Sequence, residues 1–292
     1  MRPRPFEYNA PTSLNEALSL LSSNEDAKIL AGGQSLVGMM KLRVASPKVL
    51  VDINGLAGLA NIREENGAIA IGALTRHDQL ARSNVVRERL MLLAEAAAVI
   101  GDQQVRNRGT IGGSLAHADP SADLPTACTA LDATVVTASA TGSRSIKSSD
   151  FFTGYFTTLL EQNEIIQEVR VQIPPDGSGG TYQKLSKGNN DFALVGVAVQ
   201  LTIDHESVCT NASIVLGGVG PIPVHATETE RTLRDHKLSD RLIEDAAQET
   251  SVKLSPPSDM RASSEYRLEM AKVLTKRGVR IAAKRAQGSN LD

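Results

Sequence analysis

The chain has 292 residues, of which 41% are hydrophobic and 22% are charged, so it is long enough for two or three domains with cores of their own. Its net charge of -2 gives no support for binding to nucleic acid, and its 3% of aromatic residues without tryptophan argue against a stacking platform for single strands. The polar N-terminus lacks an apolar segment of the signal-peptide type, and no run reaches the roughly 18 apolar residues of a membrane helix. We therefore expect a cytoplasmic protein without a membrane span.

In the first part of the chain, helices and strands are predicted to alternate. Ser13 and Glu16 have the spacing of a capping box, with apolar residues at helical spacing behind them. The predicted elements are a helix over 14–21, strands over 28–31, 48–53 and 68–74, a buried helix over 87–100, a helix over 122–131 and strands over 133–138 and 164–173. A polar turn is expected at 64–67. Residues 101–120 are glycine-rich and non-periodic, and a long irregular segment of this kind is usually functional.

The second part of the chain begins after the clearest predicted linker, Pro174–Gly180, where prolines stop a strand and glycines follow. The elements predicted after it are strands over 181–186, 192–203 and 208–216 and helices over 226–236, 240–254 and 263–286. Strands followed by helices indicate a small antiparallel sheet in an α+β arrangement.

Cys128 and Cys209 are the only cysteines of the chain. They could pair, although two isolated cysteines are more often reduced core residues of a cytosolic protein. An iron–sulfur cluster typically needs four thiolates, so the metal centres of any redox reaction are expected on another chain.

Two glycine pairs are the candidate binding segments of the sequence. Gly32-Gly33 follows a predicted strand, and Gly112-Gly113 lies inside the irregular segment. Without a Cβ, consecutive backbone N–H groups can turn toward one anion, and two such loops could hold a pyrophosphate with help from the hydroxyls of Ser35, Thr110 and Ser114. Neither loop matches the G-x-G-x-x-G or the G-x-x-x-x-G-K-[ST] fingerprint, and either pair alone could be an ordinary turn.

Longer motifs around these loops resemble a known family. The first is Leu30-Ala-Gly-Gly-Gln-Ser-Leu-Val-Gly-Met-Met-Lys-Leu-Arg43, and the most specific is Gln104-Val-Arg-Asn-Arg-Gly-Thr-Ile-Gly-Gly-Ser-Leu-Ala-His-Ala-Asp-Pro-Ser-Ala-Asp-Leu-Pro125. Further matching runs are 50–53, 71–77, 163–166, 182–184, 191–193 and 216–220. In order and spacing the chain resembles the FAD-binding medium subunit of molybdenum hydroxylases, the carbon monoxide dehydrogenase and xanthine dehydrogenase family.

The resemblance implies an α+β fold with two parts. An FAD-binding domain of the vanillyl-alcohol-oxidase type (PCMH type) would span residues 1–176, with two subdomains split near residue 55. A smaller α+β domain of the carbon monoxide dehydrogenase flavoprotein type would span residues 178–288. FAD would lie extended, with its ring toward the second domain.

The resemblance also implies a set of cofactor-binding residues, with no catalytic or metal-binding residue on this chain. The pyrophosphate cradle would comprise Ile29, Leu30, Ala31, Gly32, Gly33, Gln34, Ser35 and Leu36 of the first loop and Thr110, Ile111, Gly112, Gly113 and Ser114 of the second. Polar contacts would come from His117 and Asp123, apolar contacts from Ile100 and Ile166, and contacts near the flavin ring from Lys184 and Phe192. Phe192 stands where several relatives have a tyrosine, so any hydroxyl role is in doubt here.

Several of these residues have another interpretation. His117 and Asp119 have H-x-D spacing, but no further ligand cluster completes a metal site. Asp123 could simply cap the next helix, and Lys184 could be an ordinary surface lysine of a strand. Arg106 and Arg108 could be solvated charges or could meet a partner subunit.

The function implied is that of an electron-transfer subunit. A large subunit would hold the molybdopterin cofactor and oxidise the substrate, and a small subunit would carry two [2Fe–2S] clusters that pass electrons to this FAD and on to an external acceptor. A dimer of heterotrimers is the expected assembly. The alternatives are a stand-alone FAD-dependent oxidoreductase of the same fold and a scaffold subunit that has lost FAD.

Overall fold

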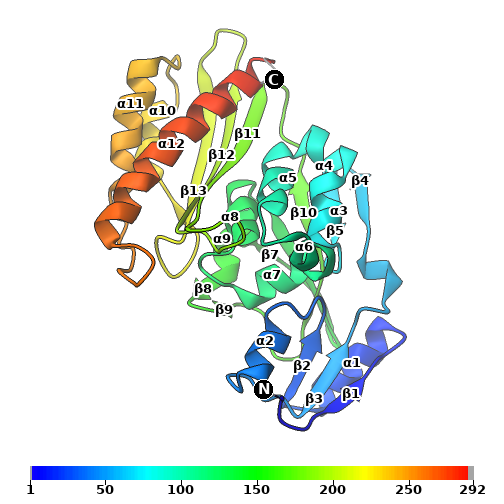
Figure 1. The fold of residues 1–292 in the computed structure, drawn as a ribbon. Coiled ribbons are helices and arrows are strands. Elements are labelled where there is room, and N and C mark those ends of the chain that lie inside the picture. The colour runs from blue at the N-terminus through cyan, green and yellow to red at the C-terminus, as the bar shows by residue number, and fades with distance from the viewer. Residues whose placement is uncertain (1, 289–292) are drawn as a thin grey trace.

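The computed structural model describes residues 2–288, which form three units in chain order (Figure 1). We call residues 2–59 the N-terminal unit, residues 60–173 the middle unit and residues 174–288 the C-terminal unit. Each unit is built on its own sheet, and a short ribbon of β8 (Phe152–Gly154) and β9 (Thr157–Thr158) accompanies the middle one. The mixture of helices and strands confirms the α+β class expected from the sequence.

The N-terminal unit has a parallel sheet with strand order β1-β3-β2, drawn in blue in Figure 1. Its elements are β1 (Glu7–Asn9), α1 (Leu14–Ser23), β2 (Ala27–Leu30), α2 (Leu36–Lys41), β3 (Val49–Asp52) and the 3₁₀ turn η1 (Ala57–Leu59). The side chain of Ser13 accepts a hydrogen bond from the backbone N–H of Glu16 and begins α1, as predicted. The carboxylate of Glu16 instead accepts from the N–H of Thr12. Leu74 and Ile165 of the middle unit complete this unit's core.

The middle unit has an antiparallel sheet with strand order β4-β5-β10-β6-β7 and helices on one face. The strands are β4 (Ile62–Glu65), β5 (Ala68–Gly72), β6 (Thr134–Ser139), β7 (Gly142–Lys147) and β10 (Ile165–Gln172). The helices are α3 (His77–Arg82), α4 (Asn84–Arg89), α5 (Met91–Ala98), α6 (Gln103–Arg108), α7 (Ile111–His117), α8 (Asp123–Ala130) and α9 (Ser148–Phe151).

The C-terminal unit has an antiparallel sheet with strand order β11-β12-β13-β14, and the long helix α12 lies along it (Figure 1). Its elements are β11 (Ser178–Leu185), β12 (Val195–Ile203), β13 (Cys209–Gly217), β14 (Val224–His225), α10 (Thr227–Leu233), α11 (Asp240–Gln248), the 3₁₀ turn η2 (Glu249–Ser251) and α12 (Ser264–Ala286). Helices α5 and α8 of the middle unit contact this sheet, and Tyr182, Ala198 and Val215 of the sheet belong to the middle unit's core. The other face of the sheet packs into a separate core with the C-terminal helices.

Three predictions about the middle unit are wrong. The turn expected at 64–67 is shorter, because Glu64 and Glu65 belong to β4 and only Asn66 and Gly67, both at positive φ, make the hairpin. The single helix over 87–100 is two helices, α4 and α5, which break at the non-helical Leu90. The segment expected to be irregular contains α6 and α7, which are too short to show helical periodicity.

The predicted linker is also shorter than expected, because Gly179 and Gly180 lie inside β11. A Cβ on Gly179 would overlap the carbonyl oxygen of Ala282, so this glycine lets α12 approach the strand closely. Cys128 and Cys209 are buried free thiols, as the more common interpretation predicted. No helix among residues 2–288 is both long and apolar enough to cross a membrane.

Candidate functional site

The first glycine loop connects β2 to α2 and has unused backbone donors. Gly33 has a φ of 74°, a conformation that glycine adopts without strain. Within residues 2–288, the backbone N–H groups of Gln34, Ser35 and Leu36 donate to no protein acceptor, and the Ser35 side chain makes no capping bond. Backbone donors of this kind suit an anion that is not part of the chain.

The second glycine loop begins α7, and its backbone donors are already used. The N–H groups of Ile111 and Gly112 donate to the carbonyl oxygens of Thr75 and Ala73 at 3.1 and 2.9 Å, and that of Gly113 donates to the hydroxyl of Thr110 at 3.1 Å. A Cβ on Gly112 would lie 2.6 Å from that of Ala73, so this glycine allows α7 to pack on the end of β5. The loop is therefore anchored to the sheet, and what it can offer a ligand is the hydroxyl groups of Thr110 and Ser114.

The first glycine loop contacts the two residues that precede the second. A Cβ on Gly32 would overlap the carbonyl group of Arg108 and would lie 2.9 Å from the Cα of Gly109. Gly109 in turn accepts a hydrogen bond from the backbone N–H of His77 and lies over its ring. Burial, with smaller effects of nearby arginines, lowers the pKa of His77 to about 4, so this ring is neutral at physiological pH.

Asp123, Lys184 and Tyr182 form a buried cluster across the boundary between the middle and C-terminal units. The Lys184 ammonium lies 2.9 Å from one carboxylate oxygen of Asp123 and donates to the carbonyl of Val99 at 3.0 Å. The Tyr182 hydroxyl donates to the other oxygen at 2.9 Å. Burial raises the pKa of Asp123, and the contacts with Lys184 and Tyr182 oppose that rise.

This cluster decides two alternatives left open by the sequence. Asp123 is the first residue of α8, and its carboxylate binds Lys184 and Tyr182, so the interpretation as a simple helix cap is wrong. The side chain of Lys184 is only 7% exposed, so it is not an ordinary surface lysine. Arg106 is not simply solvated either, because its guanidinium donates to the carbonyls of Ile100 and Gly101.

The remaining predicted site residues lie in different environments. His117 ends α7 and contacts the ring of Phe156 with centroids 5.3 Å apart, and burial lowers its pKa. Ile100 is partly buried at the end of α5, whereas Ile166 on β10 is buried in the shared core. Phe192 is 46% exposed in the segment that joins β11 to β12. The structure thus joins the two loops and pairs Asp123 with Lys184, but Ile166 faces other core residues.

Four further residues of this region were not predicted as site residues, although Arg76 and Tyr182 lie inside the matching runs 71–77 and 182–184. Asn54 and Arg76 connect the two glycine loops, and Tyr182 completes the buried cluster. Glu95 accepts hydrogen bonds from the Thr181 hydroxyl, the Tyr182 N–H and the Arg285 guanidinium at 2.8, 2.9 and 2.6 Å. All four act across long sequence separations, which residue patterns do not report.

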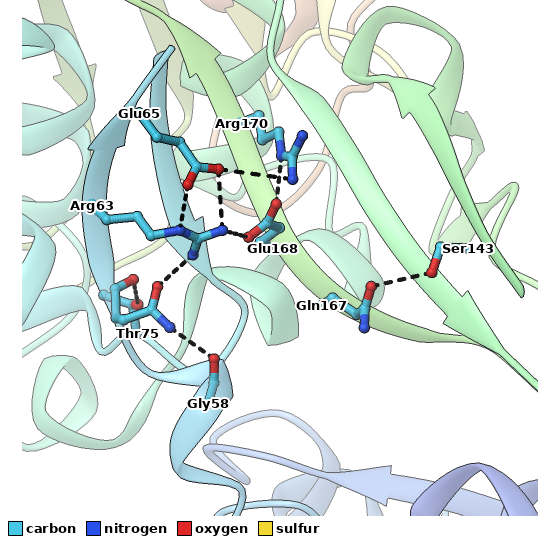
Figure 2. Close-up of polar contacts among 9 residues, drawn as sticks. Gly58, Arg63, Glu65, Thr75, Ser143, Gln167, Glu168 and Arg170 are labelled. Carbon is cyan, nitrogen blue, oxygen red and sulfur yellow. Dashed lines mark hydrogen bonds and ion pairs between the residues drawn. The ribbon is translucent and has the colours of Figure 1, made fainter. Parts of the chain in front are cut away.

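A groove on the open face of the middle sheet is the main competing site, and Figure 2 shows its polar contacts. Its volume is about 510 Å³, and its lining residues are Gly58, Leu59, Arg63, Val136, Ser143, Gln167, Glu168 and Arg170. The charges there are paired, since Glu168 accepts from Arg63 at 2.6 Å and from Arg170 at 2.5 Å. Burial alone would raise the pKa of Glu168, but these hydrogen bonds lower it. The groove therefore has the character of a structural ion-pair cluster.

Comparison with known proteins identifies relatives along nearly the whole chain. Residues 4–175 match the family described as the FAD binding domain in molybdopterin dehydrogenase, and residues 180–282 match the carbon monoxide dehydrogenase flavoprotein C-terminal domain. The chain is 41% identical to the glyceraldehyde dehydrogenase medium chain of Sulfolobus acidocaldarius, over 97% of this chain and 100% of the relative. It is 40% identical to the carbon monoxide dehydrogenase medium chain of Hydrogenophaga pseudoflava, over 97% and 98%.

Solved structures give the same result. A chain of carbon monoxide dehydrogenase from Hydrogenophaga pseudoflava matches with a TM-score of 0.94 and 40% identity, covering 98% of this chain and 99% of the other. A chain of quinoline 2-oxidoreductase from Pseudomonas putida 86 matches with a TM-score of 0.93 and 34% identity, covering 98% and 99%.

Proposed function

Because the chain belongs to the FAD-binding medium subunits of molybdenum hydroxylases, we propose that it is the subunit through which electrons leave such a complex. The fold is an FAD-binding domain of the vanillyl-alcohol-oxidase type followed by a flavoprotein C-terminal domain, as the resemblance implied. Bound FAD supplies the redox chemistry, accepting electrons singly and releasing them in pairs. The chain's own residues would bind the cofactor and orient it.

The unused donors of the first loop are the observation that carries the proposal for the cofactor site. The N–H groups from Gln34 to Leu36 would bind the pyrophosphate, while the anchored second loop would contribute the hydroxyls of Thr110 and Ser114. The cradle so proposed comprises residues 29–36 and 110–114. The close contact of Gly32 with Arg108 supports it, because a side chain there would separate the loops.

Further cofactor contacts are proposed beyond the cradle. His117 and Asp123 would provide polar contacts, Ile100 and Ile166 apolar ones, and Lys184 and Phe192 would lie near the flavin ring. The buried Lys184–Asp123 pair supports a fixed lysine position at the junction of the two domains. Ile166 is only 5% exposed, so any contact with the cofactor would come from within the core. We propose domain limits of 1–176, with subdomains split near residue 55, and 178–288, which follow the sheets of the three units.

We also propose the partners and the direction of electron flow. Electrons would come from two [2Fe–2S] clusters of a small subunit, after substrate oxidation at the molybdopterin cofactor of a large subunit, and would pass to an external acceptor. The chain's cysteines number only two and both are buried, which supports clusters on another chain. A dimer of heterotrimers in the cytoplasm is the assembly we propose.

The rate of flavin reduction tests this function. The chain is purified with its co-expressed partners and also alone, and acid release from both preparations is expected to give FAD. Oxidisable substrate of the complex is expected to bleach the flavin absorption of the complex and to leave that of the isolated chain unchanged. Equal bleaching of the isolated chain would indicate a stand-alone flavoenzyme, and a colourless chain that FAD does not reconstitute would indicate a scaffold subunit.

A further inference from the structure

Asn54, just beyond the carboxyl end of β3, binds the first glycine loop. Its side-chain N–H donates to the carbonyl oxygen of Ala31 at 2.7 Å and to a carboxylate oxygen of Asp52 at 2.7 Å. Asp52 is fixed in turn, because its other oxygen accepts from the Tyr8 hydroxyl at 2.6 Å. The Asn54 amide is thereby oriented with its carbonyl oxygen facing away from the loop, free for another donor.

That donor is Arg76, which precedes α3 in the middle unit. One guanidinium nitrogen donates to the side-chain oxygen of Asn54 at 2.7 Å, and the other donates to the backbone carbonyl of Arg108. The same carbonyl group is the one that Gly32 touches. These hydrogen bonds form a continuous chain that begins at Ala31 in the first glycine loop and ends at Arg108, two residues before the second loop. Asn54 and Arg76 are its two middle members.

We propose that Arg76 and Asn54 form a clamp that holds the two glycine loops at the spacing that FAD requires, so that both are positioning residues for the cofactor. The inference rests on the proposed cofactor site between these loops. The loops belong to different units. Gly32 meets the backbone of Arg108 and Gly109, just before the second loop, and this close packing has no directional bond that would by itself fix the spacing of the loops. The clamp fixes it in advance and reduces the ordering that binding would otherwise require.

The chemistry of the two side chains suits this role. A planar guanidinium can donate to two acceptors in fixed directions, which a lysine ammonium on a flexible stem cannot reproduce. Arg76, Asn54 and Asp52 are all partly buried, so their hydrogen bonds are less exposed to competition from water than those of a surface cluster. The negative charge of Asp52 also acts on both Arg76 and Arg108 and offsets the repulsion between these two arginines.

The test compares FAD affinity in the flavin-free, full-length chain. FAD is titrated and its fluorescence followed for the wild type, Arg76→Ala, Asn54→Ala, the double variant, Arg76→Lys and Arg82→Ala. Arg82 is the last residue of α3, the helix that Arg76 precedes. It is 70% exposed and pairs with Asp78, so Arg82→Ala is the matched control. All titrations are made well below the Tm of each flavin-free variant, so that each chain is folded.

We expect Arg76→Ala and Asn54→Ala each to raise the Kd for FAD about tenfold or more, with Arg76→Lys in between and Arg82→Ala unchanged. The Kd of the double variant is expected to equal that of the single variant that binds FAD less tightly, because each single change already breaks the same chain of hydrogen bonds. An unchanged Kd in both single variants, or fully additive effects in the double variant, would overturn the clamp. A wild-type chain that binds no FAD would instead contradict the proposed function itself.

Discussion

The carbonyl group of Arg108 lies directly against Gly32, so two segments distant in sequence meet there without an intervening side chain. A guanidinium N–H of Arg76 donates to the same carbonyl oxygen. The contact brings a loop with unused backbone donors next to a loop that is anchored to the middle sheet. The predictions below test this arrangement and the buried contacts around it.

Gly32→Ala is expected to weaken FAD binding without preventing folding. The added methyl group would overlap the Arg108 carbonyl and push the loops apart, at a cost of roughly 1–3 kcal/mol for such overpacking. If this cost falls on the FAD-bound form, it corresponds to a rise in Kd of about 5- to 150-fold, measured by FAD titration. Gly38→Ala on α2 is the matched control, because a Cβ there meets no atom within 4 Å. Equal Kd values for the two variants would contradict the close approach of the loops.

Gly33→Val and Gly113→Val are expected to lose most of the bound FAD for different reasons. Gly33 has positive φ, which a β-branched residue adopts only with strain. At Gly113 the new side chain would crowd the Thr110 hydroxyl, since even a Cβ would lie 2.8 Å from it. Flavin content after acid release gives the measurement. Full occupancy in both variants would mean that these loops are only turns.

Lys184→Met is expected to destabilise the protein by roughly 3–5 kcal/mol, because it leaves the buried carboxylate of Asp123 without its charge partner. Urea unfolding provides the free energy of unfolding. Lys187→Met, at an exposed position nearby, is the control and is expected to change it little. The double variant Lys184→Met with Asp123→Asn is expected to regain part of the loss, and a double variant no better than Lys184→Met would contradict the explanation.

Glu95→Ala is expected to weaken the attachment of the C-terminal unit. The change removes the acceptor for Thr181, Tyr182 and Arg285, at a cost of roughly 2–3 kcal/mol. The free energy of unfolding is measured, and so is the rate of proteolytic cleavage in the segment between β10 and β11. The exposed Glu88→Ala on α4 is the control. Both quantities should change only in Glu95→Ala, and identical behaviour of the two variants would contradict this role.

His77 is expected to make stability depend on pH between about 4 and 6.5. The pKa of His77 is lowered to about 4 in the folded protein, so the unfolded chain binds a proton in this window that the folded one does not. Its contribution is fully present above pH 6.5 and is lost as pH falls, by roughly 2 kcal/mol at pH 5. His77→Gln should reduce the difference in unfolding free energy between pH 7.5 and pH 5.

The exposed His205→Gln variant is the control for this measurement. Glu164 and Glu168, whose pKa values are lowered because hydrogen bonds from arginines outweigh burial, lose their contribution as pH falls below their ordinary range, so they act in a more acidic window. A pH dependence in His77→Gln equal to that of the wild type would show that His77 is not kept neutral by its surroundings.

Local residue patterns were enough to predict much of this protein. The Ser13 cap, the long C-terminal helix and the strands β5, β6, β10, β11, β12 and β13 follow from spacing and turn residues that act over a few positions, whereas β4, β7 and β14 were not predicted. The glycine loops and their motifs likewise indicated the FAD-binding family. Short elements such as α6 and α7 were missed because one or two turns show no periodicity.

Tertiary contacts decided which partner each of these polar groups binds. The glycine loops look equivalent in sequence, yet Ala73 and Thr75 occupy the donors of the second, while those of the first remain unused. Lysine is typical of surface positions, and only the packing of α5 and α8 against the C-terminal sheet buries Lys184 with Asp123. A buried donor or charge takes whichever partner the fold brings within about 3 Å, and that partner can come from anywhere in the chain. Periodicity records only near neighbours, so Arg76, Asn54 and Glu95 acquire their roles when the three units pack together.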